Sequence, residues 1–306
     1  MKMEAQETMT SNDFYKTRSY SGCIGAAFNL FCANFATIFK KTWLPAMVFA
    51  IVCGLYAFTA TNIAAGCGKA ATPSGMLMVL GLELAITVCA LVANSRTKAG
   101  FLSLVNGCTM KQNFIRHLKA TAVLAACIIV AGIVSLAANM VLTHFFISHK
   151  TPETTAGTIL MCSSAAVAII LAVTCTPFAY SMTRFLMHNT KAGEMFGKHY
   201  RAGFKRLGFL LVIGIIVALI MLVVNAFMAL PAYIITTASQ IDGIGVCNGD
   251  PTGLPTYFTW LSFFTIAIVS FILTYTMFWT DLVLCYAYGT IEADATEEAE
   301  MHKTGE

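Results

Sequence analysis

The chain has 306 residues, of which 58% are hydrophobic and only 11% charged, with a formal net charge of +4. Soluble domains average about 25% charged residues, so this composition excludes a soluble globular fold for most of the chain. The basic residues cluster in three short stretches, which indicates contact with anionic lipid headgroups and argues against nucleic acid as a partner.

Two identical four-residue motifs indicate an internal repeat. Residues 97–100 and 190–193 both read Thr-Lys-Ala-Gly, and each copy opens a basic segment. A looser copy, with Lys16, Thr17 and Arg18, lies near the start of the chain. Each copy leads into a pair of long apolar segments, so we interpret the chain as three repeated units.

An apolar stripe at helical spacing precedes each of these pairs. In the first unit the stripe consists of Phe28, Phe31, Phe35, Ile38 and Phe39, and it is followed by Lys40 and Lys41. This pattern predicts an amphipathic helix lying in the headgroup region. Segments 96–119 and 190–207 show the same combination, and we expect Gly107 to divide the former into two short helices.

Six apolar segments follow the stripes in pairs. We predict membrane spans at about 43–65, 76–94, 120–146, 158–182, 208–236 and 257–279. Each exceeds the roughly 17 residues that cross about 30 Å of hydrocarbon. The predicted fold class is therefore all-α: a polytopic membrane bundle of six transmembrane helices in three repeated pairs, each preceded by a cytoplasmic interfacial amphipathic helix. Residues 1–291 would form a single membrane domain, and residues 292–306 an acidic disordered tail.

The distribution of Lys and Arg predicts the orientation. Five lie before residue 42, five in 96–119 and six in 184–206, against only Lys69 and Lys150 in the other loops. The positive-inside rule therefore places both termini and all three basic segments in the cytoplasm.

The residues around the first span support a resemblance. Phe35, Phe39, Lys40, Lys41 and Trp43 form an aromatic and basic entry into a membrane pair. Used three times, this pattern resembles the uncharacterised bacterial six-span families that include the membrane domain attached to some glycerophosphodiester phosphodiesterases. The resemblance implies a six-span fold in a bacterial cytoplasmic (inner) membrane and leaves the activity open.

Intramembrane polar residues are the first candidate site. Glu83 lies near the middle of the second span, and Thr87 and Asn94 continue its face. An ionisable residue there costs about 3 kcal/mol on insertion scales, which favours an interior position. We predict that Glu83 faces the bundle interior, where its nearest candidates for hydrogen bonding are Asn139 and Asn225 in the third and fifth spans.

Charged residues at the cytoplasmic ends give two further candidates. Arg184 and Asp281 each follow a threonine at the end of a span, which suggests an ion pair, with two separate side chains reaching toward the headgroups as the alternative. The candidate lipid-binding residues are Lys40, Lys41, Lys198, Arg201, Lys205 and Arg206. Each surface-proximal basic residue contributes roughly 1 kcal/mol toward an anionic membrane.

Most of the eleven cysteines lie inside apolar segments. There they pack as small hydrophobic residues. Cys67 and Cys247 are the two that fall in outward loops, and a disulfide between them is weighed against two free thiols. Small residues recur at four-residue intervals, as in Ala46, Ala50 and Gly54, which indicates close helix packing either within one bundle or in a homo-oligomer.

The sequence favours a binding role over catalysis. No serine lies in a nucleophile-elbow sequence, no acidic pair marks hydrolysis, and no cofactor or metal motif is present. We therefore expect a non-enzymatic membrane binding, scaffold or membrane-organising protein, whose protein partners the sequence does not identify. The alternative is a transporter or channel for a small solute, with Glu83 on its path.

Overall fold

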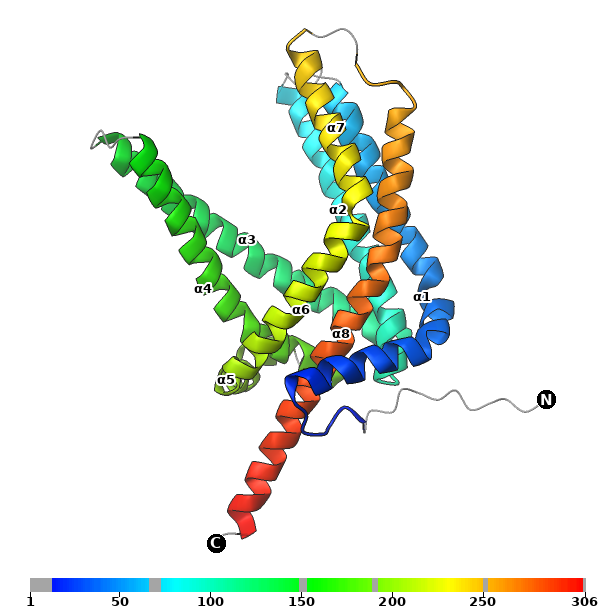
Figure 1. Cartoon of the computed structure of the whole chain (residues 1–306), viewed down its shortest axis with the longest axis vertical. Coiled ribbons are helices and arrows are strands. Elements are labelled where there is room, and N and C mark those ends of the chain that lie inside the picture. Colours follow the sequence, from blue (N-terminus) through cyan, green and yellow to red (C-terminus); the bar gives the residue numbers. More distant parts are fainter. Residues whose placement is uncertain (1–12, 66–72, 149–152, 189–191, 250–252, 305–306) are drawn as a thin grey trace, which may run out of the picture.

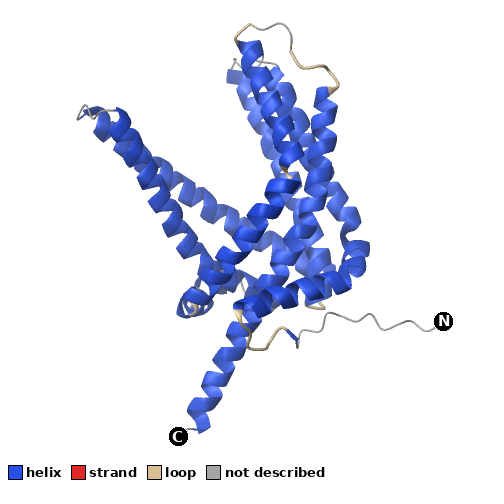
Figure 2. Ribbon diagram, in the orientation of Figure 1, coloured by secondary structure: helices blue, strands red, loops and turns tan. Residues whose placement is uncertain are grey.

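A computed structural model describes residues 13–65, 73–148, 153–188, 192–249 and 253–304. These residues form α-helices and turns, without β-strands (Figure 2). The helices are α1 (Tyr20–Ala65), α2 (Pro73–Val105), α3 (Met110–Ser148), α4 (Glu153–Met187), the 3-10 helix η2 (Ala192–Phe196), α5 (Lys198–Lys205), α6 (Leu207–Met228), α7 (Leu230–Cys247) and α8 (Phe258–Thr304).

Six of the helices in the described ranges are long and apolar enough to cross a membrane. They are α1, α2, α3, α4, α6 and α8. Helices suit this composition because every backbone polar group is satisfied within its own segment, which hydrocarbon requires. The prediction of an all-helical protein with six apolar spans is confirmed.

The molecule has a packed end and an open end (Figure 1). We call the packed end the base: it contains the α2–α3 turn, α5 and the start of α1. The far end is where α1, α3 and α7 finish. At the far end α1, α2, α7 and α8 stay together, whereas the α3–α4 hairpin diverges from them and gives the molecule a V shape.

The first two basic segments are parts of long helices. The predicted interfacial helix and the first span form one helix, α1, which runs across the base and then bends toward the far end (Figure 1). The second helix does not end at Asn94 as predicted but continues to Val105, because Thr97, Ala99 and Gly100 are buried. A Cβ on Gly100 would lie 3.4 Å from Thr42 of α1. Gly107, with φ of 65°, forms the turn into α3.

The fifth predicted span is broken into two helices. Ala229 separates α6 from α7, and Pro231 lies at the start of α7. Proline lacks the N–H for a helical hydrogen bond and clashes with the preceding turn, so the helix bends there. The bend carries the chain from contacts with α4 and α8 to contacts with α1 and α8.

The acidic tail is helical, contrary to the prediction of disorder. Helix α8 continues without interruption to Thr304. Its carboxylates have cationic partners on other segments: Glu292 pairs with Arg184, and Glu298 pairs with Arg206. The prediction failed because it counted the negative charges of residues 292–306 without the basic side chains that meet them.

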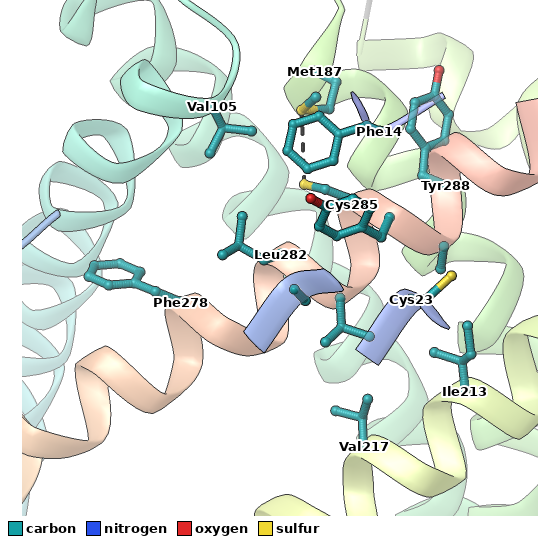
Figure 3. Close-up of a cluster of buried hydrophobic side chains, with 14 of the residues drawn as sticks. Phe14, Cys23, Val105, Met187, Ile213, Val217, Phe278, Leu282, Cys285 and Tyr288 are labelled. Carbon is teal, nitrogen blue, oxygen red and sulfur yellow. Dashed lines mark hydrogen bonds between the residues drawn. The ribbon is translucent and has the colours of Figure 1, made fainter. Parts of the chain in front are cut away.

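The main hydrophobic core lies at the base and surrounds α8. Phe278, Leu282, Val283 and Tyr286 of α8 are almost fully buried, together with Ile213 of α6. Figure 3 shows this cluster, in which Cys285 and Met187 place their sulfur atoms 3.9 Å apart. Helix α8 is therefore the element around which the base is packed.

The small-residue stripe of α1 is used inside the bundle. Ala46, Ala50 and Gly54 are buried. A Cβ on Gly54 would lie 2.8 Å from the carbonyl oxygen of Phe263, so α1 and α8 approach closely there. The equivalent stripe on α2 differs, since Gly81, Ala85 and Cys89 are exposed.

Candidate functional site

The base holds an ion pair between Lys98 of α2 and Asp281 of α8. The Lys98 side chain is 12% exposed and the Asp281 side chain 31% exposed. The Lys98 ammonium also lies 5.4 Å from the centre of the Phe278 ring, which stacks on Phe101. Both cationic contacts link α2 to α8, so this lysine connects two helices that are far apart in the sequence.

A small cavity adjoins the ion pair. Its volume is about 100 Å³, and its lining includes Lys98, Asp281, Thr183, Cys285 and His117. The His117 imidazole is 7% exposed, and its Nδ1 lies 3.1 Å from the Ser95 hydroxyl and 3.2 Å from the Thr121 hydroxyl. Helices α2, α3, α4 and α8 thus bring titratable and hydroxyl groups to the lining of one small cavity.

The predicted pair between Arg184 and Asp281 is wrong. Arg184 Nη1 instead lies 2.6 Å from Glu292 Oε1, and the same carboxylate oxygen accepts a hydrogen bond from Tyr180 at 2.5 Å. Asp281 and Glu292 are eleven residues apart and so share one face of α8.

The N-terminal segment docks onto α8 at a glycine, a contact that sequence reasoning missed. A Cβ on Gly289 would lie 2.1 Å from the Phe14 carbonyl oxygen, so no larger residue fits. The Phe14 ring packs 4.7 Å from the Tyr286 ring, and Thr290 donates a hydrogen bond of 3.2 Å to the Lys16 carbonyl. This segment therefore closes the base from below.

Several titratable side chains meet at this docking segment. Tyr15 and His188 are hydrogen-bonded at 2.9 Å, and burial, aided by the positive charge of Arg184, lowers the pKa of His188. The hydrogen bond from Lys16 holds the pKa of Asp13 below its usual value. The neutral imidazole is thus the form that suits the packed base.

Helix α5 presents a basic face. Lys198, Arg201 and Lys205 lie on one side of the helix and are exposed. On the opposite side Gly203 is buried, and a Cβ there would lie 3.0 Å from Pro177 of α4. The Tyr200 hydroxyl donates a hydrogen bond of 2.9 Å to the Thr174 carbonyl, so α5 is fastened along α4.

The six candidate lipid-binding residues are not equivalent in the structure. Lys40 is exposed like the three basic residues of α5, and Lys41 is half-buried. Arg206 already forms an ion pair with Glu298 of α8. Four of the six side chains are therefore exposed to the surroundings of the base.

The predicted polar site around Glu83 is not assembled. Glu83 Oε1 accepts a hydrogen bond of 3.1 Å from Thr59 of α1, and its Oε2 is buried without a partner. In the described chain neither Asn139 nor Asn225 hydrogen-bonds Glu83. Asn139 lies on α3, which diverges from α2 toward the far end (Figure 1), and Asn225 lies on α6, which packs mainly against α4 and α8. Thr87 is exposed and donates to the Glu83 carbonyl at 2.7 Å, whereas Asn94 is half-buried.

The choice between a disulfide and two free thiols at Cys67 and Cys247 lies outside the described residues. Cys67 falls in the range 66–72, and only the backbone of Cys247, at the end of α7, is described. Within the described ranges, no group of three or more His, Cys, Asp or Glu residues is placed to hold a metal ion.

An open apolar groove runs between α3 and α4. Its volume is about 720 Å³, and it is lined by residues of α3 from Val123 to Val134 and of α4 from Val167 to Leu171. Phe196 of η2 contributes to the lining and stacks on Phe178 of α4, with 5.5 Å between ring centres. The groove therefore begins beside the residues that lead into α5.

Six apolar helices joined at a packed base define the class of this chain: a multi-pass α-helical membrane protein. Comparison with protein-family models, with curated proteins and with solved structures found no match.

Proposed function

We propose that this protein binds anionic phospholipid headgroups at its base and organises the surrounding membrane, without catalysing a reaction. The observation that carries the proposal is the basic face of α5. Lys198, Arg201 and Lys205 are exposed on one side of a helix whose other side is fastened to α4. Such a helix lies well in the headgroup region, with its charges toward lipid phosphates.

In this proposal the base faces the cytoplasm of a bacterial cell. The excess of Lys and Arg in the segments that form the base supports that orientation. The start of α1, with Lys40 exposed, and α5 would then form two interfacial elements on one side of the bilayer. The three helical pairs preceded by basic segments remain part of the proposal, as does the likeness to bacterial six-span families.

The test measures anionic lipid bound to the purified protein. In the variant Lys198→Gln/Arg201→Gln/Lys205→Gln, we expect retention of phosphatidylglycerol to fall by about tenfold or more, because each basic residue contributes roughly 1 kcal/mol. Arg206→Gln is the matched control, since Arg206 is already paired with Glu298. Unchanged retention in the triple variant would overturn the proposal.

A second candidate function is transport of a small solute. The observation in its favour is the buried Oε2 of Glu83, which has no partner. A proton-coupled role requires that Glu83→Gln, which cannot titrate, abolishes pH-dependent uptake into vesicles although it folds normally. A structural role requires that Glu83→Gln behaves like the wild type and that Glu83→Leu is less stable, because the hydrogen bond between Thr59 of α1 and residue 83 of α2 is lost.

A further inference from the structure

The groove between α3 and α4 matches one leaflet of a bilayer in length. Its α3 side extends from Val123 to Val134, which is about 16 Å at the helical rise of 1.5 Å per residue. Half of the hydrocarbon core is about 15 Å thick. Its volume of about 720 Å³ also lies within the usual range of ligand sites, about 300–1,000 Å³.

Basic side chains lie near one end of this groove. Lys119 is exposed and lies one helical turn before Val123, on the face of α3 that lines the groove. On the other side of the groove, Phe196 is followed within five residues by Lys198 and Arg201, which are both exposed. The far part of the lining is apolar. The basic end of the groove complements the phosphate of an anionic phospholipid, and the apolar remainder complements its acyl chains.

We propose that this groove holds an acyl chain of an anionic phospholipid whose phosphate is bound by Lys119, Lys198 and Arg201. The inference deepens the proposed function and rests on it, because it names where one such lipid is seated. Within a bilayer, moving an acyl chain from neighbouring lipid into a protein groove gains no hydrophobic free energy. The charges therefore supply the selectivity, and the groove supplies the position.

The experiment uses the full chain in nanodiscs of phosphatidylcholine with a minority of phosphatidylglycerol that carries a diazirine midway along one acyl chain. After irradiation, labelled peptides are mapped by mass spectrometry. We expect the label to concentrate on the groove residues of α3 and α4, compared with exposed positions of α3 such as Ile129. A phosphatidylcholine probe with the same diazirine should label both sets alike.

Matched variants separate the groove from the charges. Ala131→Phe fills the groove and should remove most of its labelling, whereas Gly132→Phe, on the opposite and exposed face of the same helix, should not. Lys119→Gln should lower phosphatidylglycerol labelling of the groove by about fivefold, the equivalent of one basic contact. Lys111→Gln, which removes an exposed lysine outside the groove face, should leave it unchanged.

Three other results would overturn the inference, and they differ in whether the proposed function survives. Even labelling of all lipid-facing positions, with phosphatidylglycerol retention still lost in the α5 triple variant, would refute the groove and leave the proposed function standing. Absence of any selectivity for phosphatidylglycerol would refute both. Labelling blocked by a second copy of the chain, detected as a doubled mass in the nanodisc, would show that the groove is a protein interface.

Discussion

The base and the α3–α4 hairpin consist of the same apolar residue types but pack differently. At the base Phe278, Leu282 and Val283 are fully buried. In the hairpin Ile129 and Val134 are each 61% exposed. Lipid is as apolar as these side chains, so hydrophobicity alone does not bring helices together in a membrane.

The difference lies in what the polar groups connect. At the base, ion pairs and hydrogen bonds join separate elements, as between Lys98 and Asp281 or between Arg184 and Glu292. In the hairpin, Thr143 and Thr158 donate to the carbonyl four residues earlier in their own helix. Polar contacts between helices therefore accompany the close packing of the base.

The largest expected effect comes from breaking the ion pair of the base. Lys98→Met should lower the free energy of unfolding by about 3 kcal/mol, because it leaves the Asp281 carboxylate partly buried without its cation. Lys98→Met/Asp281→Leu should recover much of that loss. Unfolding of the purified variants in detergent measures both, and a double variant as unstable as the sum of the single ones would contradict the pairing.

The docking of the N-terminal segment gives a smaller effect. Gly289→Ala places a Cβ where the Phe14 carbonyl lies, so the segment must move. We expect a loss of about 2 kcal/mol, typical of overpacking, together with faster proteolysis within residues 13–19. Protease sensitivity equal to that of the wild type would show that the segment does not depend on this glycine.

The effect of a Gly→Ala substitution on stability should have opposite signs in the two regions. Gly54→Ala should cost about 1 kcal/mol, since the new Cβ meets the Phe263 carbonyl of α8. Gly132→Ala, in the hairpin, meets nothing within 4 Å and should stabilise α3 by about 0.5–1 kcal/mol through helix propensity. Thermal unfolding of both variants is the measurement, and equal shifts would contradict the contrast between packed and open regions.

The smallest effect is a dependence on pH. The pKa of His188 is lower in the folded protein than in the unfolded chain, so the unfolded chain takes up the proton first as the pH falls. Stability should therefore decline slightly below about pH 6.5 and level off below the folded-state pKa. His188→Gln should make this decline in melting temperature smaller, while Lys111→Gln should leave it unchanged.

The features that could be predicted from the sequence are those that a local residue pattern determines. The six apolar spans follow from composition and length, and the burial of Ala46, Ala50 and Gly54 agrees with their four-residue spacing. The ion pairs could not be predicted, because Lys98 and Asp281 are 183 residues apart and no periodicity relates them. The groove was also missed, since Val123 to Val134 looks like any lipid-facing helix until α4 and Phe196 are placed beside it.

The length of helix α8 affects how far its ends move when it tilts. Its 47 residues form one unbroken helix, about 70 Å long, which is more than twice the thickness of the hydrocarbon core. Figure 1 shows it running from the far end through the base and beyond. A tilt of about 10° around its middle moves each tip by roughly 6 Å. Any such tilt would have to stretch or break the ion pairs that Glu292 and Glu298 form with Arg184 and Arg206.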